Sequence, residues 1–419
     1  MKQLLIFIFV GVIVLDIIGC AQPSLVQSNK GRITSPDVNK TDLDILSDGN
    51  NTFALDLYQE LKETSGNIFY SPYSISSALA MTYAGARGDT EKQMAETLNF
   101  TLPQDKLHPA FNSVALALAS RGQETEDQDK MGFVLKNVNA IWGQKNYQFQ
   151  PAFLDVLAEN YGAGMRILDF AKEPEKSRST INDWVSEQTA NKIQELLPAG
   201  SIDPGIFLVL TNAIYFKANW SHQFDEKRTL NGQFNLLDGS KVTVPMMNQT
   251  EYFDYAEGNG YQALELLYRT RELSMIILLP EQGDFQKFEN SLQYSQVKGV
   301  IDNLEYRQVI LSMPKFSFDS KFNLKQTLSK MGMPIAFSGG ADFSGIAEGG
   351  GFIDGVYHSA FVVVDEKGTE AGAATAVTIA KAAPGGPVEF TMNRPFIFLI
   401  RDIETNTILF IGRVLNPLE

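Results

Sequence analysis

A strand followed by a long run of small residues is the feature that most constrains this chain. Residues 361–364 are four apolar residues in succession, which is typical of a strand buried on both faces. Residues 369–379 are mostly Ala, Gly, Thr and Val. If this segment is extended, one of its faces carries no charge and little bulk, so it could fit between two packed strands. A flexible Ala/Gly-rich surface loop is the alternative, and composition alone favours it at least equally.

Several motifs in one order resemble the serpin family and decide between these alternatives. EKGTEAGAAT from Glu366 and FTMNRPFIFLI from Phe390 are similar to the family's hinge and to the strand after its reactive loop. The other matches are NIFYSPYSISSALAMTYAGARGDTEKQM from Asn67, TNAIYFKANW from Thr211, VPMM from Val244 and ADFSGI from Ala341. The resemblance implies an α+β serpin fold. Its parts would be a large central mixed β-sheet, two smaller sheets, surrounding helices and an exposed reactive loop at about residues 366–389.

The start of the chain resembles an export signal. Residues 1–19 contain Lys2 and an apolar stretch, and they end in a sequence similar to a bacterial lipobox before Cys20. Asp16 departs from that pattern, so a plain secretory signal is the alternative; the apolar run is too short for a spanning helix. We expect lipidation of Cys20, a polar tether over residues 20–44 and one serpin domain over residues 45–419. The protein would then be extracytoplasmic, either lipid-anchored to the cell envelope or secreted.

Composition and motifs exclude several function classes. The formal net charge of −14 argues against nucleic-acid binding. With three His and one Cys in the whole chain, we expect no metal site, no cofactor and no internal disulfide. No G-x-S-x-G, H-E-x-x-H or Walker-type motif is present, so an enzyme is not expected, and a hydrolase is the remaining catalytic alternative. Residues 101–129 hold few basic residues, so we expect no polyanion activator.

Four polar residues match the cluster that lies beneath the family's central sheet, called the shutter: Ser71, Ser74, Asn212 and His358. Strands that part and admit another strand need hydrogen bonds that can be exchanged, and hydroxyl, amide and imidazole groups provide them. The alternative is that His358 is an ordinary buried histidine and that the serines cap a helix after Pro72.

The hinge and the point of entry into the sheet, called the breach, also follow from the resemblance. The hinge residues would be Glu366, Gly368, Thr369, Ala371, Ala373, Ala374 and Thr375; the breach residues would be Trp220, Lys315 and Glu366. A Lys315–Glu366 ion pair contributes about 1 kcal/mol at most if it is exposed. We expect Thr369 to enter the sheet first, with its side chain inward.

The resemblance implies a monomeric inhibitor that traps a serine protease covalently as an acyl-enzyme. Counting from Glu366 places the reactive bond at Ala382-Ala383, which suits elastase-like or subtilisin-like proteases, whereas counting back from Pro395 gives Pro384, a poor residue before a cut. Lys381 is the alternative for trypsin-like proteases. A non-inhibitory serpin that acts as a chaperone or carrier is the alternative function.

Overall fold

Sheet A is the first of two β-sheets in the computed structural model, which describes residues 23–121, 133–369 and 386–419. It has seven strands and contains both parallel and antiparallel pairs. From one edge to the other they are β1 (Ser24–Val26), β4 (Met165–Leu168), β3 (Phe133–Gln144), β5 (Leu208–Asn219), β13 (Gly368–Thr369), β12 (Ile353–Val364) and β11 (Phe316–Asn323). The large central mixed sheet expected from the sequence is therefore present.

Sheet B has a path of eight strands and one branch, so the two smaller sheets that we expected are continuous. The path is β14 (Val388–Thr391), β10 (Glu305–Pro314), β7 (Lys241–Gly258), β8 (Tyr261–Leu267), β9 (Leu273–Pro280), β15 (Phe396–Asp402), β16 (Ile408–Val414) and β2 (Ile68–Tyr70); β6 (Leu230–Asn235) branches from β7. The two sheets are continuous because β7 is long enough to belong to both. Over most of its 18 residues β7 pairs with β6 and β10, and near its end it pairs with β8.

Nine α-helices surround the sheets in the described part of the chain. They are α1 (Lys40–Leu61), α2 (Pro72–Tyr83), α3 (Gly88–Leu98), α4 (Gln104–Ser120), α5 (Pro151–Val156), α6 (Pro174–Gln188), α7 (Phe285–Ser291), α8 (Tyr294–Asp302) and α9 (Lys325–Met331). A π-helical turn, η2 (Leu157–Tyr161), continues α5, and short 3₁₀ turns occupy η3 (Glu226–Arg228) and η4 (Pro334–Phe337). Among the described helices, none combines the length and the apolar character that crossing a membrane requires.

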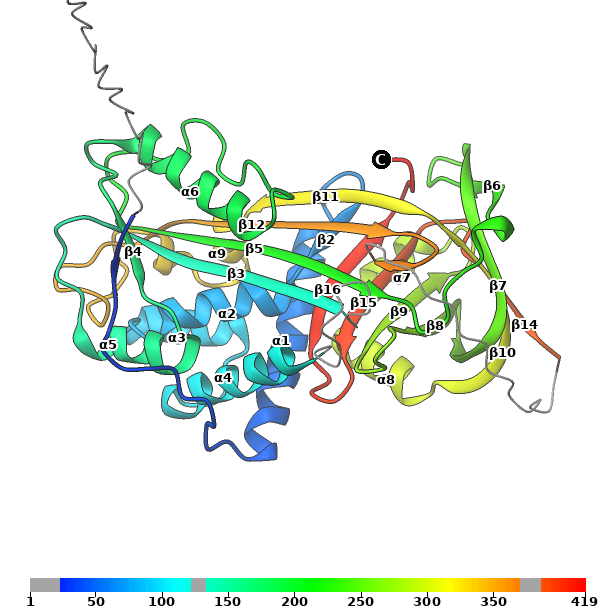
Figure 1. The fold of residues 1–419 in the computed structure, drawn as a ribbon, viewed down its shortest axis with the longest axis horizontal. Helices are drawn as coiled ribbons and strands as arrows, with labels where there is room; N and C mark the ends of the chain where they lie inside the picture. The colour runs from blue at the N-terminus through cyan, green and yellow to red at the C-terminus, as the bar shows by residue number, and fades with distance from the viewer. Residues whose placement is uncertain (1–22, 122–132, 370–385) are drawn as a thin grey trace, which may run out of the picture.

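Strand β5 shows why sheet A is buried on both faces. Its side chains alternate between two sides, as the two-residue period of a strand requires. Ile214 and Phe216 belong to the main hydrophobic core, whereas Val209 and Ala213 belong to a second core that includes residues of α6. Helix α6 therefore covers one face of the sheet, and α2 and α4 lie on the other (Figure 1).

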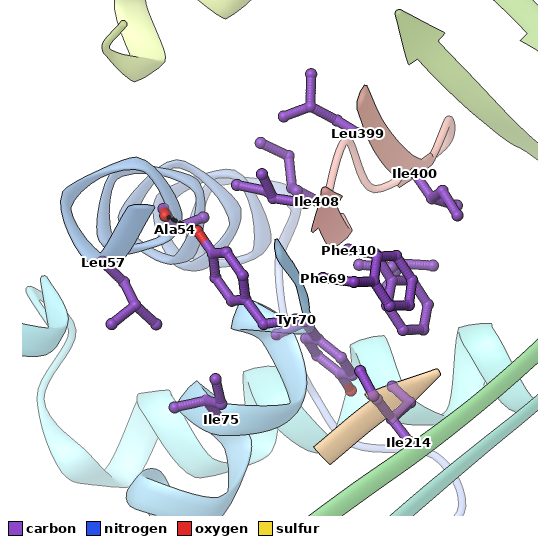
Figure 2. Packing of buried hydrophobic residues seen from close by; sticks show 14 of the residues in the cluster. Ala54, Leu57, Phe69, Tyr70, Ile75, Ile214, Leu399, Ile400, Ile408 and Phe410 are labelled. Carbon is purple, nitrogen blue, oxygen red and sulfur yellow. Dashed lines mark hydrogen bonds between the residues drawn. The ribbon is translucent and has the colours of Figure 1, made fainter. Parts of the chain in front are cut away.

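Aromatic side chains join the two sheets to the helices (Figure 2). Phe69 of β2 stacks on Phe410 of β16 with ring centroids 5.0 Å apart, and Phe410 lies 5.4 Å from Phe216 of β5. The hydroxyl of Tyr70 donates to the backbone oxygen of Ala54 in α1 at 2.8 Å. Full burial of side chains of this size stabilises a fold by about 1.5–3 kcal/mol each, so this contact region holds the helices and both sheets together.

We expected residues 20–44 to form a polar tether outside the folded domain, but in the structure residues 24–44 pack onto the domain. β1 pairs antiparallel with β4 and becomes the edge strand of sheet A. Farther along, Lys30 forms ion pairs with Asp155 at 3.2 Å and with Glu159 at 3.0 Å. No hydrophobic periodicity marks this segment in the sequence, because its contacts are backbone pairing and ion pairs and Leu25 is 47% exposed.

Helix α1 also begins earlier than the Ile45 boundary that we expected. The side chain of Asn39 accepts a hydrogen bond from the backbone N–H of Asp42 at 2.8 Å, which is the usual role of an N-cap residue. The helix consequently starts at Lys40 and carries residues 40–44, which we had assigned to the tether, into the folded domain.

We predict that Gly164→Val releases the N-terminal segment without unfolding the domain. A Cβ atom at Gly164 would lie 2.8 Å from the backbone oxygen of Val26, so β1 could not remain paired with β4. Hydrogen exchange should accelerate in residues 24–33 and stay unchanged in β16. Gly299→Val is the matched control, since a Cβ atom there meets nothing within 4 Å. Unchanged protection of residues 24–33 in the Gly164 variant would contradict this role of β1.

Candidate functional site

Sheet A is divided at one end by a strand that has only two residues. Over most of their length β5 and β12 pair directly and in parallel, from Ile353↔Leu208 to Phe361↔Tyr215. Beyond that point β13 lies between them, where Thr369 pairs antiparallel with Val364 of β12 and with Ala218 of β5. The sheet has thus admitted the start of an extra strand, which continues toward the run of small residues that follows Thr369.

A tight turn over residues 365–368 directs the chain back into the sheet. The backbone N–H of Asp365 donates to the oxygen of Gly368 at 2.9 Å, and the Asp365 carboxylate accepts from the backbone N–H of Lys367 at 2.9 Å. Trp220, which directly follows β5, holds this turn with two hydrogen bonds. Its indole Nε1 donates to the backbone oxygen of Asp365 at 3.0 Å, and its backbone N–H donates to the backbone oxygen of Lys367 at 2.9 Å.

The Lys315–Glu366 pair is less exposed than we assumed from the sequence. Glu366 is 6% exposed; its carboxylate accepts from Nζ of Lys315 at 2.6 Å and from the hydroxyl of Thr229 at 2.7 Å. Partial burial opposes ionisation of Glu366, but these two hydrogen bonds, a backbone hydrogen bond and the charge of Lys315 together lower the pKa of the carboxyl group. Removal of Lys315 would leave a buried carboxylate without a cation, which costs more than loss of an exposed pair.

Thr369 lies inside the sheet with its side chain inward. It is 1% exposed, and its hydroxyl is 2.9 Å from that of Tyr268, which stacks on Trp220 with centroids 4.7 Å apart. Gly368 permits this close approach, because a Cβ atom there would lie 2.1 Å from the backbone oxygen of Ala218. Thr369 therefore already lies within sheet A in this structure.

The four shutter residues form one buried network beneath the β5–β12 pairing. The imidazole of His358 accepts at Nε2 from the backbone N–H of Ser71 at 3.1 Å, and its Nδ1 contacts Oδ1 of Asn212. Nδ2 of Asn212 donates to the hydroxyl of Ser74 at 2.5 Å. His358, Asn212, Ser71 and Ser74 are all fully buried.

Both sequence interpretations of these serines describe the structure. Ser71 is the N-cap of α2, with its hydroxyl accepting from the backbone N–H of Ser74 at 3.2 Å, and Pro72 occupies the first turn. The same residue joins α2 to His358. Asn137 and Asn139 of β3 complete the network through the Ser74 hydroxyl, which donates to them at 2.5 and 3.2 Å.

Sequence reasoning missed four residues of the site, namely Asn137, Asn139, Thr229 and Tyr268. They lie outside the motifs that carried the resemblance, and no local pattern in the sequence marks them. Other predicted residues lie outside the described part of the chain, so their positions stay predictions. They are Cys20, the hinge residues Ala371, Ala373, Ala374 and Thr375, and the reactive-bond candidates Lys381, Ala382 and Ala383.

Burial sets the charge of the shutter. It lowers the pKa of His358 to about 3, although the hydrogen bond to Asn212 partly opposes the shift. Because an unfolded His has a pKa near 6.5, the unfolded chain binds the additional proton between about pH 3 and 6.5. The contribution of His358 to stability is therefore complete above pH 6.5 and declines as the pH falls below it.

We predict that the cost of His358→Gln depends on pH. At pH 7 the variant should be less stable, because buried partners lose hydrogen bonds worth about 1–3 kcal/mol per group. Between pH 7 and pH 5 the difference in unfolding free energy from wild type should narrow by about 2 kcal/mol, since only wild type must hold this imidazole neutral. Urea unfolding at each pH measures it. Leu57→Ala, a core deletion that removes no titratable group, should keep a constant difference; a constant difference for His358→Gln would contradict the prediction.

Comparison with known proteins gives one family. A family model for "Serpin (serine protease inhibitor)" matches residues 48–417. An uncharacterised serpin-like protein of Thermococcus kodakarensis is 40% identical over 389 residues, covering 90% of this chain and 89% of the relative. The human leukocyte elastase inhibitor is also 40% identical, covering 89% of this chain and 99% of its own.

Solved structures agree with the sequence matches. The native state of the thermophilic serpin tengpin aligns with a TM-score of 0.80 at 28% identity, covering 94% of this chain and all of that one. Human thyroxine-binding globulin, solved with its thyroid hormone ligand, aligns with a TM-score of 0.79 at 31% identity, covering 90% of this chain and all of that one. With the sheet A architecture and the shutter network, these matches establish that the chain belongs to the serpin family, which is described as a family of serine protease inhibitors and not of enzymes.

Proposed function

We propose that this serpin inhibits serine proteases irreversibly, by trapping an acyl-enzyme and inserting its reactive loop into sheet A. The observation that carries the proposal is β13, which already lies between β5 and β12 and leads into residues with small side chains. Thr369 of β13 belongs to sheet A and β14 of sheet B begins at Val388, so the predicted reactive bond lies between these two strands in the sequence.

The chemistry begins as ordinary proteolysis. The protease serine attacks the carbonyl carbon of Ala382, the peptide bond to Ala383 breaks, and the amine of Ala383 leaves with a proton. The loop is then an ester of the protease and is no longer held at its far end. Insertion of residues after Thr369 carries the attached protease with it, away from the geometry in which water can complete hydrolysis.

Strand insertion releases enough free energy for this step. One parallel pairing between β5 and β12 is replaced by two antiparallel pairings to a new strand. About a dozen inserted residues, at about 0.5–1.5 kcal/mol per net hydrogen bond with further apolar burial, provide on the order of 10 kcal/mol. Typical domains have stabilities of about 5–15 kcal/mol, so distortion of a protease active site is within this range.

Elastase-like or subtilisin-like proteases are the proposed targets. Ala382 presents a small apolar side chain before the cut, which suits a small specificity pocket. The similarity to a leukocyte elastase inhibitor supports this class. Trypsin-like proteases are the second proposed class of target, because they would cut after Lys381, one residue earlier.

A carrier without inhibitory activity is the alternative function. The structural similarity to thyroxine-binding globulin, which was solved with a bound hormone, favours it. The hinge favours inhibition instead: loops that do not insert usually carry charge or bulk at the positions of residues 369–375, which here read Thr, Glu, Ala, Gly, Ala, Ala, Thr. Formation of a covalent complex separates the two functions.

We predict that Thr369→Arg converts the inhibitor into a substrate. The arginine would place an unpaired charge at a site that is 1% exposed, so the loop should be cleaved but should not insert. Titration against an elastase should show about a tenfold or greater rise in the inhibitor needed per protease, with loss of the SDS-resistant complex. Thr369→Ser keeps the hydroxyl next to Tyr268 and should inhibit like wild type.

The outcome of this titration is decisive. Wild-type trapping by Thr369→Arg would refute loop insertion here, and no complex with wild type would favour the carrier function. The mass of the released C-terminal fragment locates the bond: a fragment beginning at Ala383 supports Ala382-Ala383, whereas a trapped trypsin with a fragment beginning at Ala382 supports Lys381.

We also propose export and lipid attachment at Cys20. Only three residues separate Cys20 from Ser24, where β1 begins, so an extended chain would hold the domain within about 14 Å of the lipid. β1 and β14 lie toward opposite ends of the long axis (Figure 1), so this anchor would leave the β14 end away from the membrane. Cys20→Ser should move the protein from the detergent phase to the aqueous phase. Wild type in the aqueous phase would indicate a plain secretory signal.

A further inference from the structure

A cavity of about 270 Å³ lies between the N-terminal segment, α2, α4 and β3. Its polar lining includes Arg32, Tyr73 and Ser77, and its apolar lining includes Met81, Leu118 and Leu135. The volume is close to the lower end of the range for small-ligand sites, about 300–1,000 Å³. Among the described residues, none of those assigned to the hinge or the breach contributes to it.

Arg32 is held in place by its Nε atom and lines the cavity with its guanidinium group. Its Nε donates to Oδ1 of Asn112 at 2.8 Å, and Asn112 is fully buried in α4. Its stem passes Gly162, where a Cβ atom would lie 3.1 Å from Cδ of Arg32. Among the described residues, its two terminal nitrogens have no hydrogen-bond or ion-pair partner. These nitrogens form the fork that binds a carboxylate with two hydrogen bonds.

Among the described residues, Asp155, Glu159 and Asp402 do not pair with Arg32, because each of these carboxylates is bonded elsewhere. Asp155 and Glu159 bind Lys30 at 3.2 and 3.0 Å. Asp402 accepts from Nε of Arg121 at 3.1 Å and also from Thr405 at 2.7 Å. Burial lowers the pKa of Arg32 from its ordinary value, but a guanidinium remains protonated at neutral pH.

Two hydroxyl groups that line the cavity from α2, those of Tyr73 and Ser77, have no protein partner in the described part of the chain. The side chains are mostly buried, at 2% and 7% exposed, and their oxygen atoms are accessible from the cavity. Hydroxyl groups can donate hydrogen bonds, so together with the guanidinium of Arg32 they form a set of donors for an acceptor. A carboxylate oxygen accepts hydrogen bonds and carries the complementary charge.

We propose that this cavity binds a small carboxylate with an apolar tail, in the manner of a medium-chain fatty acid. The carboxylate lies between Arg32 and the hydroxyls of Tyr73 and Ser77. The tail lies along Met81, Leu118 and Leu135. The ligand contacts the N-terminal segment, α2, α4 and β3 together, so it stabilises the uncleaved protein through mass action.

The cavity is continuous with the shutter. Asn137 and Asn139 of β3 line it, and their Oδ1 atoms lie within hydrogen-bond distance of the hydroxyl of Ser74. An occupant therefore lies against residues that are in direct contact with the shutter. Binding itself does not depend on the proposed inhibition, and its measurement needs no protease.

Calorimetric titration of the uncleaved protein with decanoate tests the site. We expect one saturable site, with affinity rising about fourfold per methylene from hexanoate until the cavity is filled. Decanol tests the head group and acetate tests the tail; each should bind at least tenfold more weakly than decanoate. Equal binding of decanol and decanoate, or absence of saturable binding across the series, would overturn the proposal.

Arg32→Met removes the charge and retains an apolar stem, so decanoate should bind at least tenfold more weakly while decanol is unaffected. Lys30→Met is the matched control, because this neighbouring cation pairs with Asp155 and Glu159 and should leave decanoate binding unchanged. If Arg32→Met does not fold, Ala115→Leu decides, since it fills the cavity from α4 and leaves Arg32 intact. Wild-type affinity in Ala115→Leu would place decanoate elsewhere and overturn the proposal.

Discussion

The pairing of β5 with β12 is the constraint on which the rest of the structure depends. His358 of β12 lies opposite Asn212 of β5, and α2 beneath them is hydrogen-bonded to both strands through Ser71 and Ser74. A strand placed between β5 and β12 adds about 4.8 Å to one strand spacing and so separates them well beyond hydrogen-bond distance. Helix α2 cannot keep its bonds to both sides, so strand insertion must exchange part of the shutter network.

The division of sheet A is already complete at one end. Phe361 of β12 still pairs directly with Tyr215 of β5. A few residues farther along, Thr369 lies between Val364 of β12 and Ala218 of β5, so the two strands are separated there. Trp220, Tyr268 and Glu366 hold this end through the hydrogen bonds of the turn, the Thr369 hydroxyl and the Lys315 ion pair. Further insertion would lengthen an existing strand without having to start one. The uncleaved form would then persist because the β5–β12 pairing opens slowly, which is kinetic stability.

Motifs in the sequence predicted the fold, because together they carry residues from strands of both sheets. Ser71 and Asn212 come from two of these motifs, and the resemblance also identified His358; the three residues form one network. Residues that complete the network from outside the motifs, such as Asn139 and Tyr268, could not be found in this way. The N-terminal segment was assigned to a tether because its order depends on partners far along the chain, such as Asp155, and not on any local periodicity.

The geometry of His358 identifies the bond that insertion has to replace. Its Nε2 accepts from the backbone N–H of Ser71, so in the neutral ring the proton lies on Nδ1 and is donated to Asn212. The second bond joins β12 directly to β5, so a strand inserted between them must break it. Helix α2 is bonded to β12 through Ser71 and to β5 through Ser74, so it follows one strand and loses its bond to the other. The imidazole N–H loses Asn212 in either case, and an inserted strand brings backbone carbonyl groups to that position. A charged imidazole would need two acceptors there, which is why burial and the low pKa suit this exchange.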